Sequence, residues 1–185
     1  LERIGPRVPF ASILEIGCGS GLFTRMLAAA FPESRITAFD VSGAMIERAR
    51  KISPARIEFA QADAHVFDSD RQFDLICSNA ALHWCRLDMV FDNCRRLLAD
   101  GGRLECSVYG PGSLAELAAV MAEVLPRHSA IPAQSFVTAS RIEELLRTRF
   151  TDVEIETVPH SVEYPSVYAL LSAVKATGTG ALVRN

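Results

Sequence analysis

The stretch from Ile13 to Leu27, "ILEIGCGSGLFTRML", places three glycines between a short apolar run and a longer one. A glycine loop lets the backbone pass close to a bound molecule, because glycine has no side chain. The first run is rich in Ile and Leu, and the second is apolar nearly all round, so we expect a buried strand, a loop and a helix. This arrangement is typical of an α/β protein that binds a ligand beside the loop.

Runs of the same two kinds alternate along the rest of the chain. We predict strands at Ser12–Ile16, Arg35–Phe39, Ile57–Ala60, Phe73–Ser78 and Arg103–Tyr109, and a sixth strand at 153–158. We predict helices at Leu22–Phe31, Gly43–Lys51, Leu87–Leu98 and Leu114–Leu125, the third of which is stopped by Gly101–Gly102. A fifth helix begins at a capping box formed by Ser140 and Glu143, and a last helix begins at Ser166. Such alternation favours a mostly parallel, doubly wound, Rossmann-like sheet with helices on both faces.

The 185 residues are enough for one domain with a sizeable core. We therefore predict a single domain over residues 1–185, with a cofactor-binding core at 11–110 and substrate-side helices and the sixth strand at 111–185. The formal net charge of −3 argues against nucleic-acid binding over the whole surface. No apolar run approaches the roughly 20 residues that span a bilayer, and no signal peptide is visible, so we expect a cytoplasmic protein. Separately, we expect a monomer.

The five cysteines form no CxxC pair and no cluster with zinc spacing, so no metal site is predicted. We interpret them as small buried thiols in a reducing compartment.

The glycines at 17, 19 and 21 read GxGxG, whereas a dinucleotide loop usually reads GxGxxG and a P-loop needs a lysine. Asp40 ends the second predicted strand, 21 residues after Gly19. A carboxylate in this position can accept hydrogen bonds from both hydroxyls of a ribose, which indicates an adenosine-type ligand. The alternative is that Asp40 stabilises the start of the following helix.

Two further features could contact an adenine. In "AQADAHVF", Asp63 could accept from the adenine amino group and the Ala64 amide could donate to a ring nitrogen, although Asp63 alone is more often a turn residue. Met45 could cover one adenine face, but it belongs to an apolar stripe and could equally be core.

The segments "LEIGCGSG", Asp40, "QADA", "FDLICSNAALHW" and "LLADGGRL" occur in the order found in class I S-adenosylmethionine-dependent methyltransferases, which this chain resembles over about Ile13 to Tyr109. The resemblance implies S-adenosyl-L-methionine as cofactor. It also implies that Glu15 helps place the methionine end, that Asp40 holds the ribose, that Asp63 and Ala64 hold the adenine, and that Asn79 lies near the sulfonium methyl.

Methyl transfer needs an in-line arrangement of nucleophile, methyl carbon and sulfur, and a carboxylate nucleophile needs no general base. For a phenol, an amine or a carbon acid, His83 could be the base, although a packed or solvent-facing histidine is the alternative. Asn79, His83 and Trp84 are therefore candidates for positioning the reacting groups.

The segments "SNAALHWC", "YGPGSLAEL", "SFVTASRIEELL" and "ALLSAVKATGTGA" are similar to the carboxyl methyltransferases of biotin synthesis, which act on a malonyl thioester of acyl carrier protein. This resemblance implies a cationic partner for the malonyl carboxylate, for which Arg141 and Lys175 are candidates; either could instead be a solvated surface cation. It also implies a last strand beside the fifth, before which this sequence ends.

Three alternatives to malonyl-acyl carrier protein remain at this stage. The thioester could be malonyl-CoA, the acceptor could be another organic acid or a quinone precursor, or the chain could be a methyltransferase-fold binding protein without catalysis.

Overall fold

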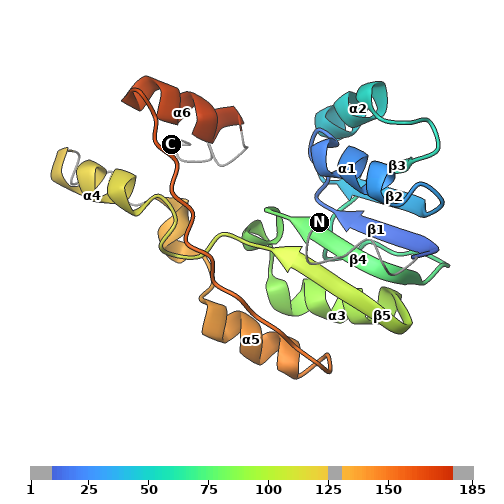
Figure 1. The fold of residues 1–185 in the computed structure, drawn as a ribbon. Coiled ribbons are helices and arrows are strands. Elements are labelled where there is room, and N and C mark those ends of the chain that lie inside the picture. Colours follow the sequence, from blue (N-terminus) through green and yellow to red (C-terminus); the bar gives the residue numbers. More distant parts are fainter. Residues whose placement is uncertain (1–9, 125–130, 177–185) are drawn as a thin grey trace. The chain divides into compact units, whose positions relative to one another are not determined.

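The computed structural model describes residues 10–124 and 131–176. Five parallel strands form one sheet in the order β3-β2-β1-β4-β5 (Figure 1). Their bounds are β1 Ser12–Ile16, β2 Arg35–Asp40, β3 Glu58–Gln61, β4 Phe73–Asn79 and β5 Leu98–Ser107. The chain runs outward from β1 to β3 and then returns to the other side of β1, so the strand order reverses between β1 and β4. The predicted doubly wound parallel sheet is confirmed, and its ligand-binding switch point lies at the carboxyl ends of β1 and β4.

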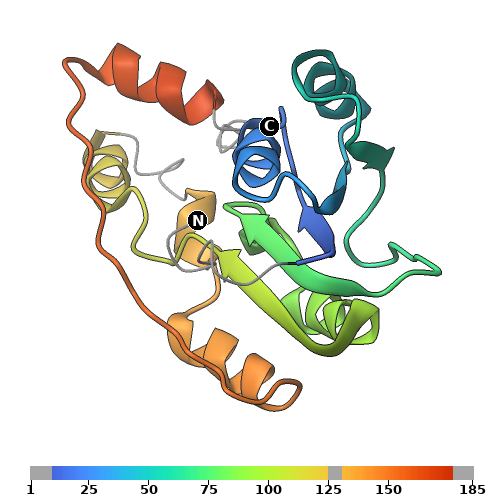
Figure 2. The same cartoon turned by 45° about the vertical axis from the view of Figure 1, so that its right-hand side comes forward.

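Helices cover both faces of this sheet. Helices α1 (Leu22–Ala30) and α2 (Gly43–Ile52) lie on one face, and α3 (Leu87–Leu97) lies on the other (Figure 1 and Figure 2). A short 3₁₀ turn, η1 (Leu82–Trp84), precedes α3. All three helices begin at the predicted residue, and α1 and α2 end within one residue of prediction, because their apolar residues recur at helical spacing.

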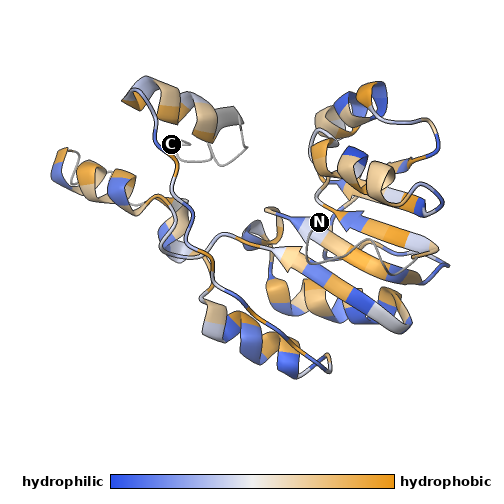
Figure 3. Ribbon diagram, in the orientation of Figure 1, coloured by the Kyte–Doolittle hydropathy of each residue, from blue (hydrophilic) through white to orange (hydrophobic). Residues whose placement is uncertain are grey.

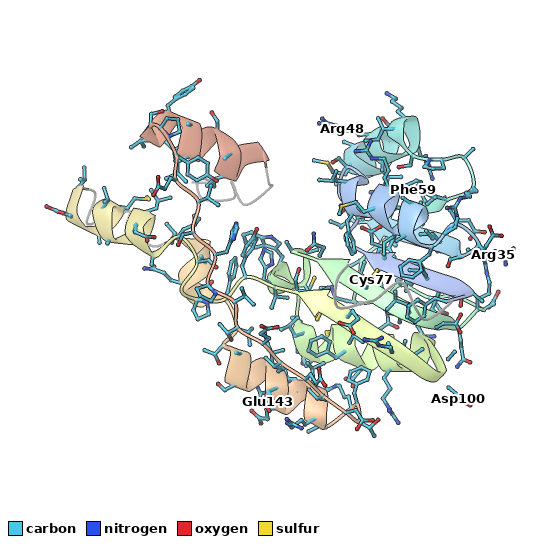
Figure 4. The ribbon with its side chains drawn as sticks, viewed as in Figure 1. Arg35, Arg48, Phe59, Cys77, Asp100 and Glu143 are labelled. Atoms are coloured by element: carbon cyan, nitrogen blue, oxygen red, sulfur yellow. The ribbon has the colours of Figure 1, made fainter. Side chains whose placement is uncertain are left out.

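The core on the α1 and α2 face is built from alternate residues of the strands. Ile13 of β1, Ile36 and Ala38 of β2, and Leu75 and Cys77 of β4 pack with Leu27 of α1 and Ile46 of α2. Figure 3 shows hydrophobic residues along the central strands, and Figure 4 places the labelled Cys77 within the sheet. Because side chains alternate between faces, Glu15 shares this buried face with Ile13.

The predicted stop of α3 at Gly101–Gly102 is wrong. The helix ends at Leu97, and β5 begins at once with Leu98 and includes both glycines. Gly101 has a φ of +73°, and the pairing of β4 with β5 shifts register between Phe73 and Leu75. A Cβ at Gly102 would lie 2.9 Å from the carbonyl oxygens of Ala99 and Phe73. These glycines therefore form an irregularity in the strand pairing and do not end the helix.

The chain divides into two compact units. The first contains the sheet and ends at Val108, and it also includes Ile142–Val153. The second contains Tyr109–Arg141 and the chain from Glu154 onward. Within it lie α4 (Ala115–Val124), a 3₁₀ turn η2 (Pro132–Ser135) and α6 (Val167–Ala176). Ala118, Ile131, Ala133 and Phe136 form its small core. The single-domain boundary therefore stays a prediction.

Helix α5 (Ala139–Arg147) forms close to its predicted position, but the predicted capping box is wrong. The side chain before the helix, Thr138, accepts from the Arg141 amide at 3.3 Å. Glu143, labelled in Figure 4, instead forms an ion pair with Arg147 one turn later, at 2.7 Å. Thr138 and Ser140 are both hydroxyl residues near the helix start, so the sequence pattern did not separate them.

The predicted sixth strand is absent from the described residues, where 153–158 is extended but has no strand partner. Ile155 and Val158 are 37% and 68% exposed, so their partial alternation reflects no buried sheet face. An extended segment becomes a strand only when a neighbouring strand satisfies its backbone groups.

Candidate cofactor site at the carboxyl ends of the strands

The glycine loop connects β1 to α1 through three residues with left-handed backbone angles. Gly17, Gly19 and Gly21 have φ values of +71°, +52° and +83°, a region that glycine occupies without steric strain. The amides of Gly17 and Cys18 donate to the Phe39 carbonyl oxygen at 2.9 and 3.0 Å. The loop is therefore folded back onto the end of β2 and brought next to Asp40.

The three glycines differ in what surrounds them. A Cβ at Gly17 would overlap the Cβ of Ala81, in the loop after β4, and a Cβ at Gly21 would lie 3.0 Å from the Cβ of Ala49 on α2. A Cβ at Gly19 would meet no described atom within 4 Å. Gly17 and Gly21 thus allow close packing of the protein itself, whereas Gly19 borders open space that a ligand can occupy.

Asp40 lies at the end of β2 with both carboxylate oxygens engaged by backbone amides. Oδ2 accepts from the Gly19 amide at 2.9 Å, and Oδ1 accepts from the Ser42 amide at 2.9 Å. Ser42 is the N-cap of α2, so Asp40 contacts the residue at the helix start, which is compatible with the alternative role considered for it. Each oxygen can accept a second hydrogen bond. The geometry of Asp40 therefore permits hydrogen bonds from ribose hydroxyls, and ribose binding stays a prediction.

Glu15 is the buried acid of this region, with a side chain only 1% exposed. Burial raises the pKa of its carboxyl group to about 7; the nearby Thr24 hydroxyl opposes this shift, and the Asp40 carboxylate adds to it. Although these two groups are close to each other, neither Glu15 Oε2 nor Thr24 Oγ1 has a partner with hydrogen-bond geometry among the described atoms. A buried acceptor without a partner is unfavourable, and a donor group on a ligand would satisfy it.

The loop after β3 presents Asp63 to solvent and holds it through His65. Asp63 Oδ1 accepts from the His65 amide at 2.9 Å and from His65 Nδ1 at 2.5 Å, and these bonds lower the pKa of Asp63. His65 Nε2 accepts from the Arg86 amide at 3.0 Å, just before α3. Ala64 is buried, and its carbonyl oxygen accepts from Asn93 of α3 at 3.2 Å. His65 was not predicted as a site residue, and its only signal in the sequence is its place two residues after Asp63.

Asn79 is the exposed last residue of β4 and faces Ser107, the last residue of β5, in the strand register. Ser107 Oγ donates to Asn79 Oδ1 at 2.6 Å. Ser107 was not predicted as a site residue, because nothing local distinguishes it from any other serine at the end of a strand.

His83 and Trp84 form η1, and their rings lie 5.1 Å apart between centroids. His83 is buried, and this burial lowers the pKa of the imidazole to about 4. The ring is thus neutral at pH 7 and weakly basic, which favours the packed interpretation over a general base. Trp84 is 46% exposed and stays a positioning candidate.

The remaining candidates divide between the two units. Met45 of α2 is 38% exposed, while Ile46 and Ala49 are the buried residues of that helix, so Met45 is not core and can contact a ligand. Arg141 is an exposed residue in the first turn of α5 and belongs to the second unit. The side chain of Lys175 lies outside the described part of the chain.

The first unit thus brings the predicted cofactor residues to one edge of the sheet. Gly19 follows β1, Asp40 ends β2, Asp63 follows β3 and Asn79 ends β4. This edge offers an open glycine loop, carboxylate acceptors at two strand ends and an exposed amide, which suits an adenosine with a further polar chain.

Comparison with known proteins agrees with this geometry. Residues 13–102 match the methyltransferase domain family. A malonyl-[acyl-carrier protein] O-methyltransferase of Methylococcus capsulatus is 35% identical over all of this chain and 67% of its own length. The chain spans 61–68% of the lengths of its similar curated relatives.

Solved structures give the same result. The N-methyltransferase NodS of Bradyrhizobium japonicum, in complex with S-adenosyl-L-homocysteine, is 25% identical with a TM-score of 0.64, over 83% of this chain and 72% of its own. Phosphoethanolamine N-methyltransferase 2 of Haemonchus contortus, in complex with S-adenosyl-L-methionine, is 27% identical with a TM-score of 0.68, over 84% of this chain and 36% of its own.

The fold, the open glycine loop and these matches define a class I methyltransferase that uses S-adenosyl-L-methionine. Within that class, the chain belongs to the malonyl-[acyl-carrier protein] O-methyltransferase family. No helix in the described part of the chain has the length and apolar character needed to cross a membrane.

Proposed function

We propose that this protein transfers the methyl group of S-adenosyl-L-methionine to the free carboxylate of a malonyl thioester carried by acyl carrier protein, in biotin synthesis. The observation that carries the proposal is the 35% identity, over the whole chain, to a malonyl-[acyl-carrier protein] O-methyltransferase. The match includes the second unit, beyond the methyltransferase domain at 13–102.

The geometry of the first unit supports a division of the cofactor among named residues. We assign the ribose to Asp40, the adenine edge to Asp63 and the Ala64 amide, one adenine face to Met45, and the methionine end to the loop from Gly17 to Gly21. The unsatisfied Oε2 of Glu15 suits the ammonium group of that methionine end. The cofactor supplies an electrophilic methyl on a sulfonium, which is already a good leaving group.

A carboxylate acceptor agrees with the state of the only histidine predicted to face the site. In methyl transfer to a carboxylate, one oxygen attacks the methyl carbon as the carbon–sulfur bond breaks, and no proton moves. A His83 with a pKa of about 4 would be a poor base for a phenol or an amine at pH 7. The chemistry therefore demands alignment of the acceptor, for which Asn79, Trp84 and the cations Arg141 and Lys175 are the candidates.

Methylation has a clear physical consequence for such a substrate. A malonyl thioester ends in a carboxylate, which is costly to bury in the apolar tunnel of an acyl-chain-elongating enzyme. The methyl ester is neutral and can be treated as an ordinary acyl end.

A reducing, cytoplasmic compartment agrees with the cysteines. All five are free in the described structure. Burial raises the pKa of the Cys18 and Cys94 thiols to about 12, so these groups stay protonated and unreactive.

We expect malonyl-acyl carrier protein, incubated with the protein and S-adenosyl-L-methionine, to gain one methyl group in intact-mass spectrometry. Acetyl-acyl carrier protein is the matched control, because it has the same carrier and thioester but no free carboxylate. Methylation of malonyl-CoA at an equal rate would show that the carrier is not recognised. Methylation of neither malonyl thioester would contradict the proposed substrate and favour another small organic acid or a quinone precursor.

A further inference from the structure

The loop after β4 is fixed by a serine from the neighbouring strand. Ser107 Oγ donates to Asn79 Oδ1 at 2.6 Å. The amide of Ala80 donates both to Ser107 Oγ, at 3.1 Å, and to the Ser107 carbonyl oxygen, at 3.0 Å. Ser107 thus contacts the side chain of Asn79 and the backbone of the next residue at the same time.

These bonds agree with one orientation of the Asn79 carboxamide. A serine hydroxyl has one proton to donate, and the Ala80 N–H occupies one of its acceptor positions. The structure places the carbonyl oxygen of Asn79 at the Ser107 hydroxyl, which donates its one proton to it, so the NH₂ group of Asn79 is turned away from Ser107. Asn79 is exposed, so this NH₂ group can donate to a ligand.

The backbone around Asn79 is held in an unfavourable conformation. Ala80 has a φ of +53°, in the left-handed region that is sterically strained for a residue other than glycine. Such a conformation persists where the surroundings hold it, and such residues cluster at functional sites. Here the two bonds from the Ala80 amide hold one side of the loop. On the other side of the loop, Ala81 packs closely against Gly17. A Cβ added to Gly17 would overlap the Cβ of Ala81.

We propose that Ser107 is a positioning residue for methyl transfer. It fixes Asn79 so that the Asn79 NH₂ group donates to an oxygen of the acceptor carboxylate and aligns the other oxygen with the methyl carbon. This inference rests on the proposed function, which places Asn79 beside the methyl group. Ser107 itself touches neither cofactor nor acceptor, and it acts only through Asn79. In-line transfer depends steeply on alignment, so a loosened Asn79 slows the reaction without removing any group that contacts the acceptor.

The test separates the rate of transfer from the affinity for the cofactor. In Ser107→Ala, we expect kcat for malonyl-acyl carrier protein to fall about tenfold, the effect of one lost hydrogen bond of typical strength. The dissociation constant for S-adenosyl-L-homocysteine should stay within about twofold, because no cofactor contact is lost. Ser107→Thr should restore kcat, since it keeps the hydroxyl and suits a strand.

Ser69→Ala is the matched control. Ser69 Oγ also accepts from a backbone amide, that of Arg71 at 3.1 Å, but it lies before β4, at the opposite edge of the sheet from Asn79. The kcat of the Ser69→Ala variant should equal that of the unaltered protein.

A double-mutant cycle with Asn79→Ala decides whether Ser107 acts through Asn79. We expect Asn79→Ala to lower kcat, and Ser107→Ala to cause no further loss in that background. If Asn79→Ala leaves kcat unchanged, the proposed place of Asn79 is wrong, and this inference is wrong with it. If Asn79→Ala lowers kcat but Ser107→Ala does not, this inference alone is wrong. Equal losses from Ser107→Ala in both backgrounds, or a parallel loss of cofactor affinity and thermal stability, would show a structural role only and overturn it.

Discussion

Replacing Gly19 by valine is expected to abolish binding of S-adenosyl-L-homocysteine while the protein stays folded. The added Cβ meets no described protein atom within 4 Å, so it enters the open space where the cofactor is proposed to lie. The φ of +52° also disfavours a β-branched residue. The backbone should therefore shift in this variant and move the amide of residue 19, which donates to Asp40 in the unaltered protein. We expect affinity in calorimetric titration to fall by at least about 100-fold, because both effects act at the same loop.

Gly17→Val is the matched control for this prediction. It makes the same chemical change two residues earlier, where the side chain would overlap Ala81. This variant should lose thermal stability as well as binding, because the loops after β1 and β4 can no longer pack together. Retained affinity in Gly19→Val would show that the open space at Gly19 is not the cofactor site. A circular dichroism spectrum of an unfolded Gly19→Val protein would instead assign this glycine to the fold.

Replacing Glu15 by glutamine is expected to stabilise the protein at neutral and alkaline pH. The pKa of Glu15 is about 7 in the folded state, against the ordinary value of 4.5 for a solvated glutamate, which is expected on unfolding. Between these two pH values the folded state therefore binds more protons than the unfolded state. The contribution of Glu15 to stability is fully present below about pH 4.5 and is lost as the pH rises. The loss is complete above about pH 7. Across about pH 5 to 8 this loss is on the order of 2–3 kcal/mol, and Glu15→Gln should abolish it.

Urea unfolding of both proteins at about pH 5 and about pH 8 measures this difference. Glu33→Gln, the same change at an exposed residue after α1, is the control and should leave the pH dependence of stability as it was. Parallel pH profiles for the unaltered protein and Glu15→Gln would contradict the buried, protonated Glu15. Cofactor affinity should respond in the opposite direction, since an ammonium group beside Glu15 favours the carboxylate and binds more tightly as the pH rises through 7.

Most of the first unit could be predicted from the sequence because its signals are local. Strands β1, β2 and β4 are short, mostly apolar runs, and the spacing of Leu87, Val90, Phe91 and Cys94 defines α3. The place of Gly19 and Asp40 at one sheet edge then follows from parallel topology, because the carboxyl ends of parallel strands lie on the same edge.

The errors arose where the structure depends on distant residues. Whether Gly101–Gly102 end a helix or form a strand irregularity is decided by pairing with β4, about 30 residues earlier in the chain. The segment 153–158 has the composition of a strand but no strand partner in the described structure. Ser107 bonds to Asn79 and His65 bonds to the Arg86 amide, both far away in the sequence, so these two contacts could not be predicted from neighbouring residues.

The central claim is that the carboxyl ends of β1, β2 and β4 hold the cofactor, with its methyl group next to Asn79. A crystal structure of this chain with S-adenosyl-L-homocysteine tests it most directly. We predict ribose hydroxyls within hydrogen-bond distance of Asp40, the methionine chain over Gly19 with its ammonium toward Glu15, and the sulfur beside Asn79. A ligand bound elsewhere, or a ribose that leaves Asp40 bonded only to the Gly19 and Ser42 amides, would contradict the account.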